Sequence, residues 1–435
     1  MGMDFSVRPA SFRSGTAEVP GDKSISHRAL MLGSIATGRT EVTGFLAGED
    51  CLPTAAAMRA LGVSIEQRSA AELVIDGVGR SGLKAPNGPL DLGNSGTAMR
   101  LMAGLLAGQP FDSVLTGDES LSGRPMNRII KPLAMMGAVI EADCDGTPPL
   151  QIRGGLHLRG IHYELPVASA QVKSSLLLAG LYADGKTSVV EPAVTRDHTE
   201  RMLRAMGVDV KAEAGTISLI GGQELRGSRI EVPGDLSSAT FIILGTLLSQ
   251  DADVIIENVG VNPTRTGVID ILQGMGADIS LENSRVFGEE PVADIHVRAS
   301  RLVGGDIDPS LVSLAIDEFP ALFVAAAAAE GETRFSGLEE LRVKESDRIA
   351  AMADGLRRLG IDIEEAPDGA TVRGGTFQGG VVDSYHDHRV AMSLAMAATI
   401  AEDNVVIQGV DNVNTSFPGF VDLAARAGLQ ISASS

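Results

Sequence analysis

The four residues Val-Pro-Gly-Asp occur twice in the chain, at Val19–Asp22 and again at Val232–Asp235. The two copies lie 213 residues apart, and twice this offset is close to the full length of 435 residues. Self-similarity at a fixed spacing indicates a fold built from copies of one structural unit. The sequence therefore predicts two similar halves.

A shorter repeat divides each half. A helical stretch that ends in glycine and leads into a short alternating strand recurs six times, for example as MRALGVSIE around Gly62. The other five glycines are Gly137, Gly207, Gly276, Gly360 and Gly428. Glycine after a helix supplies the left-handed backbone conformation that ends many helices. The chain is therefore predicted to contain six similar units, three in each half.

Each unit contains another helical stretch, which precedes the glycine-ending one and has a polar start and an apolar body. In the first unit Ile25, Ala29, Leu32 and Ala36 follow the spacing of one helix face. Each unit is thus expected to alternate two helices with short strands, which predicts two α/β domains. The chain must pass between them near residues 19–20 and 233–234, and two crossings suggest a cleft that can close.

Composition and charge exclude several classes of partner. The 36 basic and 56 acidic residues leave a net charge of −20, the wrong sign for nucleic acid or an anionic membrane. No apolar run approaches the roughly 20 residues that span a bilayer. The start lacks a secretory signal, and Cys51 and Cys144 form no disulfide framework. We expect a cytoplasmic protein with no nucleic-acid partner and no membrane partner.

Polar and cationic residues gather at the predicted helix starts and in the loops that follow. If the units are arranged alike, their helix N-termini point the same way and add positive dipole ends to these cations. This pattern predicts a site for small ligands with several negative charges. For any single residue, a helix cap or a solvated face remains the alternative.

Two other motifs indicate no nucleotide or metal site. Gly180–Thr187 (GLYADGKT) fits a phosphate-binding loop, but such a loop follows a strand and opens a helix. Here the motif follows a helical stretch and precedes a strand-like one, so we interpret it as a helix stop. His386, Asp387 and His388 are adjacent, and adjacent side chains do not converge on one ion. No metal is therefore expected.

Eight motifs between residues 20 and 392 carry a specific resemblance. They are PGDKSISHRAL, LGNSGTAMR, GRPMNR, SAQVKS, TRDHTERML, DEFPAL, LRVKESDRI and DHRVAMS. Together they resemble the 5-enolpyruvylshikimate-3-phosphate synthase family. The resemblance implies an α/β fold of two similar inverse α/β barrel domains, each of three βαβαββ units. It implies a first domain at 20–236, a second at 1–19 with 237–435, and an active site in the cleft between them.

The same resemblance implies a function. Members transfer the enolpyruvyl group of phosphoenolpyruvate to the 5-hydroxyl of shikimate 3-phosphate and release phosphate, on the route to chorismate and the aromatic amino acids. It implies these two small molecules as substrates, no cofactor, and a monomer.

The resemblance also assigns residues. Those for shikimate 3-phosphate are Lys23, Ser24, Arg28, Ser169, Ala170, Gln171, Arg196, Asp317 and Lys344. Those for phosphoenolpyruvate are Lys23, Gly96, Arg124, Gln171, Arg348 and Arg389. The catalytic residues are Asp317 as base, Glu345 as acid, and Lys23. Glu318, next to Asp317, is expected to point elsewhere and to tolerate Gln.

The chain departs from the family pattern at two places. Thr415 stands before SFP where many relatives have Lys, so the role of that Lys is not assigned to it. Ala170 and the RPMNR loop resemble a bacterial subgroup with an SAQ motif, which leaves the response to the inhibitor glyphosate open.

Two alternative functions remain at this stage. UDP-N-acetylglucosamine enolpyruvyl transferase shares the architecture and the donor, but it typically carries a Cys in the loop before the Arg-Pro motif. The stretch 111–125 has none. A non-catalytic repeat scaffold is the other alternative. It predicts that Asp317, Glu345 and the cations do not converge.

Overall fold

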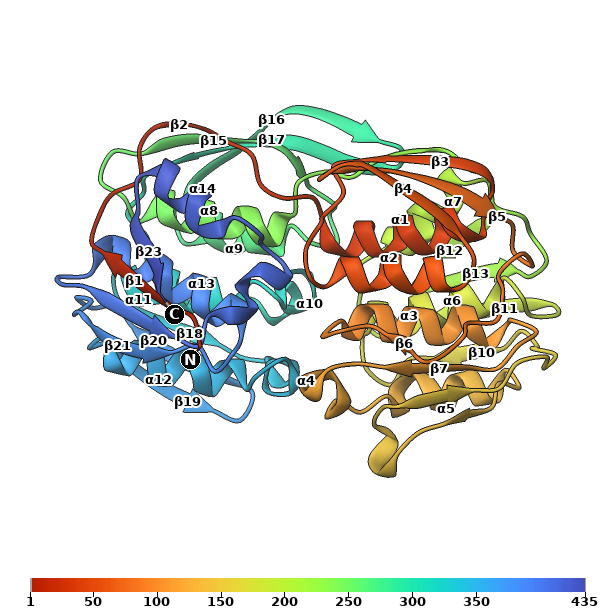
Figure 1. Ribbon diagram of the computed structural model, residues 1–435. Coiled ribbons are helices and arrows are strands. Elements are labelled where there is room, and N and C mark those ends of the chain that lie inside the picture. The colour runs from red at the N-terminus through yellow and green to blue at the C-terminus, as the bar shows by residue number, and fades with distance from the viewer. Residues whose placement is uncertain (1, 435) are drawn as a thin grey trace. The chain divides into compact units, whose positions relative to one another are not determined.

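The computed structural model describes residues 2–434 and divides into two compact units. Unit 1 comprises the residues up to Pro20, Pro233–Arg285, and those from Pro291 onward. Unit 2 comprises Gly21–Val232 and Val286–Glu290. Both termini belong to unit 1, where β1 (Asp4–Arg8) pairs antiparallel with β23 (Gln430–Ser434) (Figure 1).

The observed units differ slightly from the expected domains, which were 20–236 and 1–19 with 237–435. Specific contacts explain the differences. The Asp235 amide donates to the Pro20 carbonyl at 2.8 Å, which groups Pro20 and the residues from 233 with unit 1. The tip at Val286–Glu290 groups with unit 2, because Arg204 pairs with Glu289 and His198 contacts Glu290, each at 2.8 Å. The chain therefore passes from one unit to the other at four positions.

Unit 2 contains three four-stranded sheets with a common strand pattern. Each begins with a parallel pair and continues with two antiparallel pairings. The first is β14 (Arg229–Glu231), β3 (Thr37–Thr43), β5 (Glu72–Val78) and β4 (Ser64–Ser69). The second is β6 (Leu90–Asp91), β7 (Ser113–Thr116), β9 (Leu150–Ile152) and β8 (Ile140–Glu141). The third is β10 (His162–Glu164), β11 (Lys186–Val190), β13 (Thr216–Ile220) and β12 (Val210–Glu213).

Unit 1 also contains three sheets. One is β16 (Asp278–Phe287), β17 (Glu290–Arg298), β15 (Asp253–Gly260) and β2 (Gly15–Ala17). Another is β21 (Gly380–Asp383), β22 (Val405–Gln408), β1 and β23. The last is β18 (Glu332–Phe335), β20 (Gly369–Arg373) and β19 (Asp362–Ala366), with isolated parallel bridges at Val303–Glu330 and Asp306–Arg334 in place of a fourth strand. Six separate sheets form across residues 2–434, and no closed barrel is found there.

The helices form two series, one of each kind per sheet. The first series is α1 (Lys23–Ile35), α3 (Gly96–Ala107), α6 (Ala170–Gly180), α8 (Leu236–Leu247), α11 (Phe319–Ala328) and α13 (His388–Ala397). The second is α2 (Cys51–Ala60), α5 (Asn127–Met135), α7 (His198–Ala205), α9 (Gly267–Gly274), α12 (Arg348–Arg358) and α14 (Phe420–Ala427). Short helices α4 (Glu119–Ser122) and α10 (Val312–Ala315) and five 3-10 turns complete the described chain.

The first-series helices form the interior of each unit. Nearly all residues of α3 and α8 are buried, because their apolar side chains surround the whole helix. The sheets lie outside them, as Figure 1 shows for β3, β4 and β5 over α1 and α2. This inverse arrangement, with helices inside and sheets outside, is the predicted α/β architecture.

The six predicted helix-ending glycines confirm the repeat. Gly62, Gly137, Gly207, Gly276, Gly360 and Gly428 follow the six second-series helices, and all have positive φ values between 84° and 121°. Residues with a Cβ are disfavoured there, which explains why the same residue recurs in every unit.

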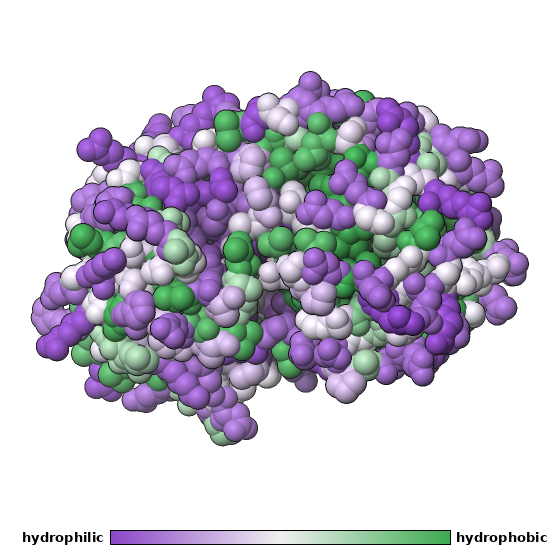
Figure 2. Space-filling view, turned by 180° about the vertical axis from the view of Figure 1, so that it is seen from behind, coloured by the Kyte–Doolittle hydropathy of each residue, from purple (hydrophilic) through white to green (hydrophobic). Residues whose placement is uncertain are grey.

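The interpretation of Gly180–Thr187 as a helix stop is also confirmed. Helix α6 ends at Gly180 and strand β11 begins at Lys186, the reverse of the order that a phosphate-binding loop needs. Lys186 is exposed. Across residues 2–434, no helix is long and apolar enough to cross a membrane. Hydrophilic residues cover much of the face drawn in Figure 2, with hydrophobic ones between them.

A buried histidine joins three helices of unit 2. His27 on α1 has Nδ1 2.9 Å from the Thr54 hydroxyl of α2 and Nε2 3.1 Å from the hydroxyl of Ser95, which caps α3. Burial lowers the pKa of His27 from 6.5 to about 3. The folded protein therefore holds the neutral ring, and protonation opposes folding.

This burial predicts a pH-dependent stability. The stabilisation is complete above the unfolded pKa of 6.5 and is lost as the pH falls from there toward 3. Between pH 7 and pH 5 the wild type should lose about 2 kcal/mol more unfolding free energy than His27→Gln. Urea denaturation at both pH values measures this difference, and equal losses would contradict the prediction.

Candidate active site

The start of α1 carries two predicted site residues of unit 2, Lys23 and Ser24. Asp22 caps the helix, since its carboxylate accepts from the Ile25 amide at 2.8 Å. Lys23 opens the helix and its Nζ lies 2.8 Å from Asp50, with 18% of the side chain exposed. Ser24 is half-buried and its carbonyl accepts from Arg28. Lys23 therefore carries its ammonium group at the N-terminus of α1, where anions are favoured.

Arg28 lies deeper. Its guanidinium donates to the hydroxyls of Thr199 (2.6 Å) and Ser174 (2.9 Å) and to the Ser24 carbonyl (2.9 Å). Burial lowers the pKa of Arg28 to about 10, an effect that Glu200 opposes and the nearby charge of Arg196 reinforces. Arg28 stays charged at neutral pH, and two cations close enough to affect each other favour an anion beside them.

The starts of α3 and α6 meet through Gln171. The Arg100 guanidinium of α3 donates to the Gln171 side-chain oxygen at 2.5 Å, and the Gln171 amide nitrogen donates to the Thr97 hydroxyl at 2.9 Å. Ser169 caps α6 and precedes the half-buried Ala170. The predicted residues Ser169, Ala170 and Gln171 are thus consecutive at one helix N-terminus.

Arg124 lies beside the start of α3. Its Nη2 donates to the Asn94 side-chain oxygen at 2.7 Å and to the Ser120 hydroxyl at 3.1 Å. A Cβ built on Gly96 would lie 3.4 Å from an Arg124 nitrogen and 3.0 Å from an Arg100 nitrogen. The absence of a side chain at Gly96 therefore leaves both guanidinium groups room at the helix N-terminus.

Behind these residues lies a buried ionic cluster that the resemblance does not assign. The Lys173 side chain is 1% exposed, and its Nζ lies 2.9 Å from Glu191 and 2.7 Å from Glu200. Glu191 also accepts a hydrogen bond from Thr195. Burial raises the pKa of Glu191, whereas Lys173 acts against that rise. Two carboxylates hold one ammonium group in the interior of unit 2.

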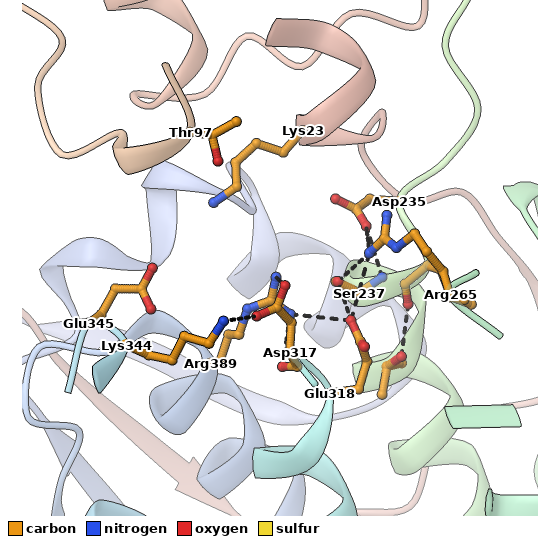
Figure 3. A network of polar contacts seen from close by, with 12 residues as sticks. Lys23, Thr97, Asp235, Ser237, Arg265, Asp317, Glu318, Lys344, Glu345 and Arg389 are labelled. Atoms are coloured by element: carbon orange, nitrogen blue, oxygen red, sulfur yellow. Dashed lines mark hydrogen bonds and ion pairs between the residues drawn. The ribbon is translucent and has the colours of Figure 1, made fainter. Parts of the chain in front are cut away.

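Asp317 is the centre of the predicted residues in unit 1. Its Oδ1 lies 3.6 Å from Lys344 and 3.5 Å from Arg348, and its Oδ2 lies 4.0 Å from Arg389. Figure 3 shows Lys344 and Arg389 directed toward this carboxylate. Asp317 does not cap α11, whose N-cap position is Glu318. Asp317 is therefore not a helix cap. It lies close to three cations, whereas a non-catalytic scaffold was expected to lack such a convergence.

Arg348 connects this carboxylate to two others. Its side chain is 1% exposed, and it lies 2.6 Å from Glu345 and 2.8 Å from Asp387. Burial alone would lower the pKa of Arg348, but Asp387, Glu345 and Asp317 together raise it above the usual range. The guanidinium is therefore a permanent charge shared by three carboxylates.

Glu318 is a residue that sequence reasoning misses. Like Asp317 it approaches Arg389, but it is 3% exposed and accepts a hydrogen bond from Ser237. Its Oε1 also lies 3.5 Å from Arg389 and 3.7 Å from Arg265 (Figure 3). Glu318→Gln is therefore expected to be destabilising and not tolerated, because it would leave two buried guanidinium groups with less negative charge.

Thr415 has a local partner. Its side-chain hydroxyl donates to the Asn412 carbonyl at 2.6 Å, within the 3-10 turn Asp411–Thr415. This contact gives the residue a structural role and no cationic one.

The two units thus hold complementary chemistry. Unit 2 presents cations at helix N-termini, a setting for phosphate and carboxylate groups. Unit 1 presents two partly exposed carboxylates, Asp317 and Glu345, among three cations, a setting for proton transfer near an anion.

Comparison with known proteins agrees with this chemistry. Residues 7–423 match the family described as "EPSP synthase (3-phosphoshikimate 1-carboxyvinyltransferase)". The chain belongs to the EPSP synthase family. It is 58% identical to the 3-phosphoshikimate 1-carboxyvinyltransferase of Alkalilimnicola ehrlichii, over 99% of this chain and 96% of that protein. The corresponding protein of Methylococcus capsulatus is also 58% identical, over 99% and 98%.

Solved structures show the same relationship. An EPSP synthase from Acinetobacter baumannii is 56% identical and covers 100% of both chains, with a TM-score of 0.91. The enolpyruvyl transferase NikO from Streptomyces tendae is 16% identical with a TM-score of 0.82, which shows the shared fold alone. The predicted family, enzyme class and enolpyruvyl transferase fold are therefore confirmed.

The ionic cluster behind the site of unit 2 yields a stability prediction. Lys173→Met should lower the unfolding free energy by about 3–5 kcal/mol, because two buried carboxylates lose their shared cation. The control Lys186→Met, at an exposed lysine, should stay within about 0.5 kcal/mol of wild type. Urea denaturation measures both variants, and similar values for the two would contradict a buried ionic role.

Proposed function

We propose that this protein transfers the enolpyruvyl group of phosphoenolpyruvate to the 5-hydroxyl of shikimate 3-phosphate, giving 5-enolpyruvylshikimate 3-phosphate and phosphate. The reaction belongs to the shikimate pathway, which leads through chorismate to the aromatic amino acids. Membership of the EPSP synthase family and the chemistry of both units support this proposal.

The observation that carries the proposal is the cluster at Asp317. One carboxylate lies within 4.0 Å of Lys344, Arg348 and Arg389, while Glu345 lies 2.6 Å from the same Arg348. A transfer between two anions needs fixed cations against their mutual repulsion, and it needs one group to accept a proton and another to deliver one. This cluster supplies all three.

The proposed steps follow from these groups. Asp317 accepts the proton of the 5-hydroxyl as the hydroxyl oxygen bonds to C2 of phosphoenolpyruvate, and Glu345, in its protonated form, delivers a proton to C3. Phosphate then leaves C2 as C3 returns a proton to the Glu345 carboxylate, which restores the double bond in the product and the protonated form of Glu345. Lys23 stabilises the negative charge of the departing phosphate. The oxidation level does not change in either step, so we propose no redox cofactor.

Binding is assigned to residues of both units. For shikimate 3-phosphate we propose Lys23, Ser24, Arg28, Ser169, Ala170, Gln171, Arg196, Asp317 and Lys344. For phosphoenolpyruvate we propose Lys23, Gly96, Arg124, Gln171, Arg348 and Arg389. Because each substrate draws on both units, we further propose that the units close on the substrates in a cleft. A monomer in the cytoplasm, without nucleic-acid or membrane partners, is the proposed working state.

One assay tests the function directly. Purified protein should release inorganic phosphate from phosphoenolpyruvate with shikimate 3-phosphate as acceptor, and not with UDP-N-acetylglucosamine. Release with the nucleotide sugar alone would replace the proposed acceptor. No release with either acceptor would favour a non-catalytic protein.

Asp317→Asn tests the base. The amide cannot accept the hydroxyl proton, so turnover should fall by roughly 10²–10⁴ while shikimate 3-phosphate still binds. The control Asp308→Asn changes an exposed aspartate that caps a 3-10 turn and should keep normal turnover, since Asn caps as well as Asp. Steady-state rates and calorimetric titration measure both. Near-normal turnover in Asp317→Asn would move the base elsewhere.

Arg124→Ala tests the donor site. Loss of this guanidinium should weaken phosphoenolpyruvate binding by about 2–5 kcal/mol and shikimate 3-phosphate binding much less. The control Arg39→Ala removes a guanidinium from an exposed ion pair with Asp76 and should change neither affinity. Equal weakening of both substrates in a folded Arg124→Ala protein would remove Arg124 from the donor site.

A further inference from the structure

A buried aspartate that the proposed reaction does not use lies behind the cluster of unit 1. Asp387 is 0% exposed, and its carboxylate meets three donors. Oδ2 accepts from Arg348 Nε at 2.8 Å and from the Ser346 hydroxyl at 3.1 Å, and Oδ1 accepts from the Arg389 amide at 2.9 Å. Asp387 thus joins the loop before α12 to the N-terminus of α13.

The contacts divide the Arg348 guanidinium into an inner edge held by a fully buried carboxylate and an outer end held by two partly exposed ones. Asp387 holds Nε and also reaches Nη2 at 3.5 Å. Nη2 and Nη1 meet Glu345 and Asp317, whose side chains are 25% and 16% exposed. An incoming carboxylate can therefore replace these partners at the terminal nitrogens while Asp387 keeps its place on Nε.

The backbone before Asp387 is held in an unfavourable conformation. Tyr385 and His386 are consecutive non-glycine residues with φ of 55° each. Such residues are strained and persist only where surrounding contacts impose them. Here the Ser384 hydroxyl accepts from the His386 amide at 3.2 Å, and the Asn412 side chain donates to the His386 carbonyl at 2.6 Å. The turn therefore fixes where the Asp387 carboxylate points.

A similar pairing occurs in an earlier unit. Asp235 caps α8 through the Ser237 amide at 2.9 Å and pairs with the buried Arg265 at 3.1 Å. Asp387 caps α13 through the second residue in the same way and pairs with Arg348. The cap-and-arginine arrangement is thus a recurring element of unit 1, and in its last copy the arginine is one assigned to the substrate.

We propose that Asp387 is a positioning residue for the enolpyruvyl transfer. It orients Arg348 so that the terminal nitrogens face the carboxylate of phosphoenolpyruvate, and it fixes the start of the helix that carries Arg389. It acts through these arginines and contacts no substrate. This role rests on the proposed function.

The neighbouring Asp347 provides a matched control. Its carboxylate caps α12 by accepting from the Ala350 amide at 3.0 Å, and it pairs with Arg342 at 2.7 Å. Asp347 and Asp387 are therefore both N-caps paired with an arginine, on helices that carry predicted substrate arginines. They differ in which arginine they hold.

The experiment compares Asp387→Asn with Asp347→Asn. Asn preserves the cap in both, so both proteins should fold. Asp387→Asn should lower kcat/KM for phosphoenolpyruvate by about 10²-fold, mostly through a higher KM, because the arginine loses its fixed orientation. Its affinity for shikimate 3-phosphate, measured by calorimetry, should change far less. Asp347→Asn should stay within about threefold of wild type in every value.

A second background separates positioning from general structural damage. If Asp387 acts through Arg348, then Asp387→Asn should add little to the loss already caused by Arg348→Lys. Fully additive losses would overturn the proposal. An unchanged KM for phosphoenolpyruvate in Asp387→Asn would do the same, as would equal losses in Asp387→Asn and Asp347→Asn.

If Asp387→Asn shows no cooperative thermal unfolding, Ser346→Ala removes one donor of the same carboxylate and should still raise the KM for phosphoenolpyruvate several-fold. No change in that variant would overturn the positioning role. Wild-type protein is assayed first, so an inactive wild type refutes the proposed function, whereas an active wild type with an insensitive Asp387 refutes only this inference.

Discussion

The ion pair between Arg348 and Asp387 is the interaction on which the site of unit 1 depends. Both side chains are removed from water, which carries a large desolvation cost for each charge. Burial alone would raise the pKa of Asp387, but the charge of Arg348 keeps it lower than usual. Removing Arg348 would leave the buried Asp387 carboxylate without its cation, and removing Asp387 would leave Arg348 with only the partly exposed carboxylates Glu345 and Asp317 among these three partners.

The pairing of Arg348 with Asp387 determines how the neighbouring carboxylates contact Arg348. Because Arg348 is held from inside, Glu345 and Asp317 can share its outer nitrogens while remaining partly exposed. Arg389 also has a buried carboxylate partner, because Glu318 lies close to both Arg389 and Arg265. Arg348 and Arg389 are thus each held by a carboxylate that is buried in the protein interior. Support of this kind is what keeps a long side chain in one orientation for recognition of a small anion.

In unit 2, hydrogen bonds to neutral groups orient two of the cations. Hydroxyls and carbonyls orient Arg28, while Arg124 is oriented by an amide oxygen and a hydroxyl among its contacts. Neutral acceptors fix a guanidinium without cancelling its charge. The positive potential at the starts of α3 and α6, which Ser95 and Ser169 cap, is preserved for anionic ligands in the same way. This difference between the units matches the division between binding groups and proton-transfer groups.

The sequence by itself determined the repeat, the α/β class, the family and the candidate residues. The repeat and the class follow from local chemistry, since helix-ending glycines such as Gly62 and polar helix starts such as Ser169 leave direct marks in the chain. The family and the roles of the candidate residues follow from the resemblance that the eight motifs carry. Tertiary structure alone decided that Asp317 is no cap, that Glu318 is buried with Arg389, and that Asp387 holds Arg348, which lies 39 positions earlier in the sequence. The physical reason is that the meaning of a charge depends on its burial and on its partner, and both are set by residues far away in the chain.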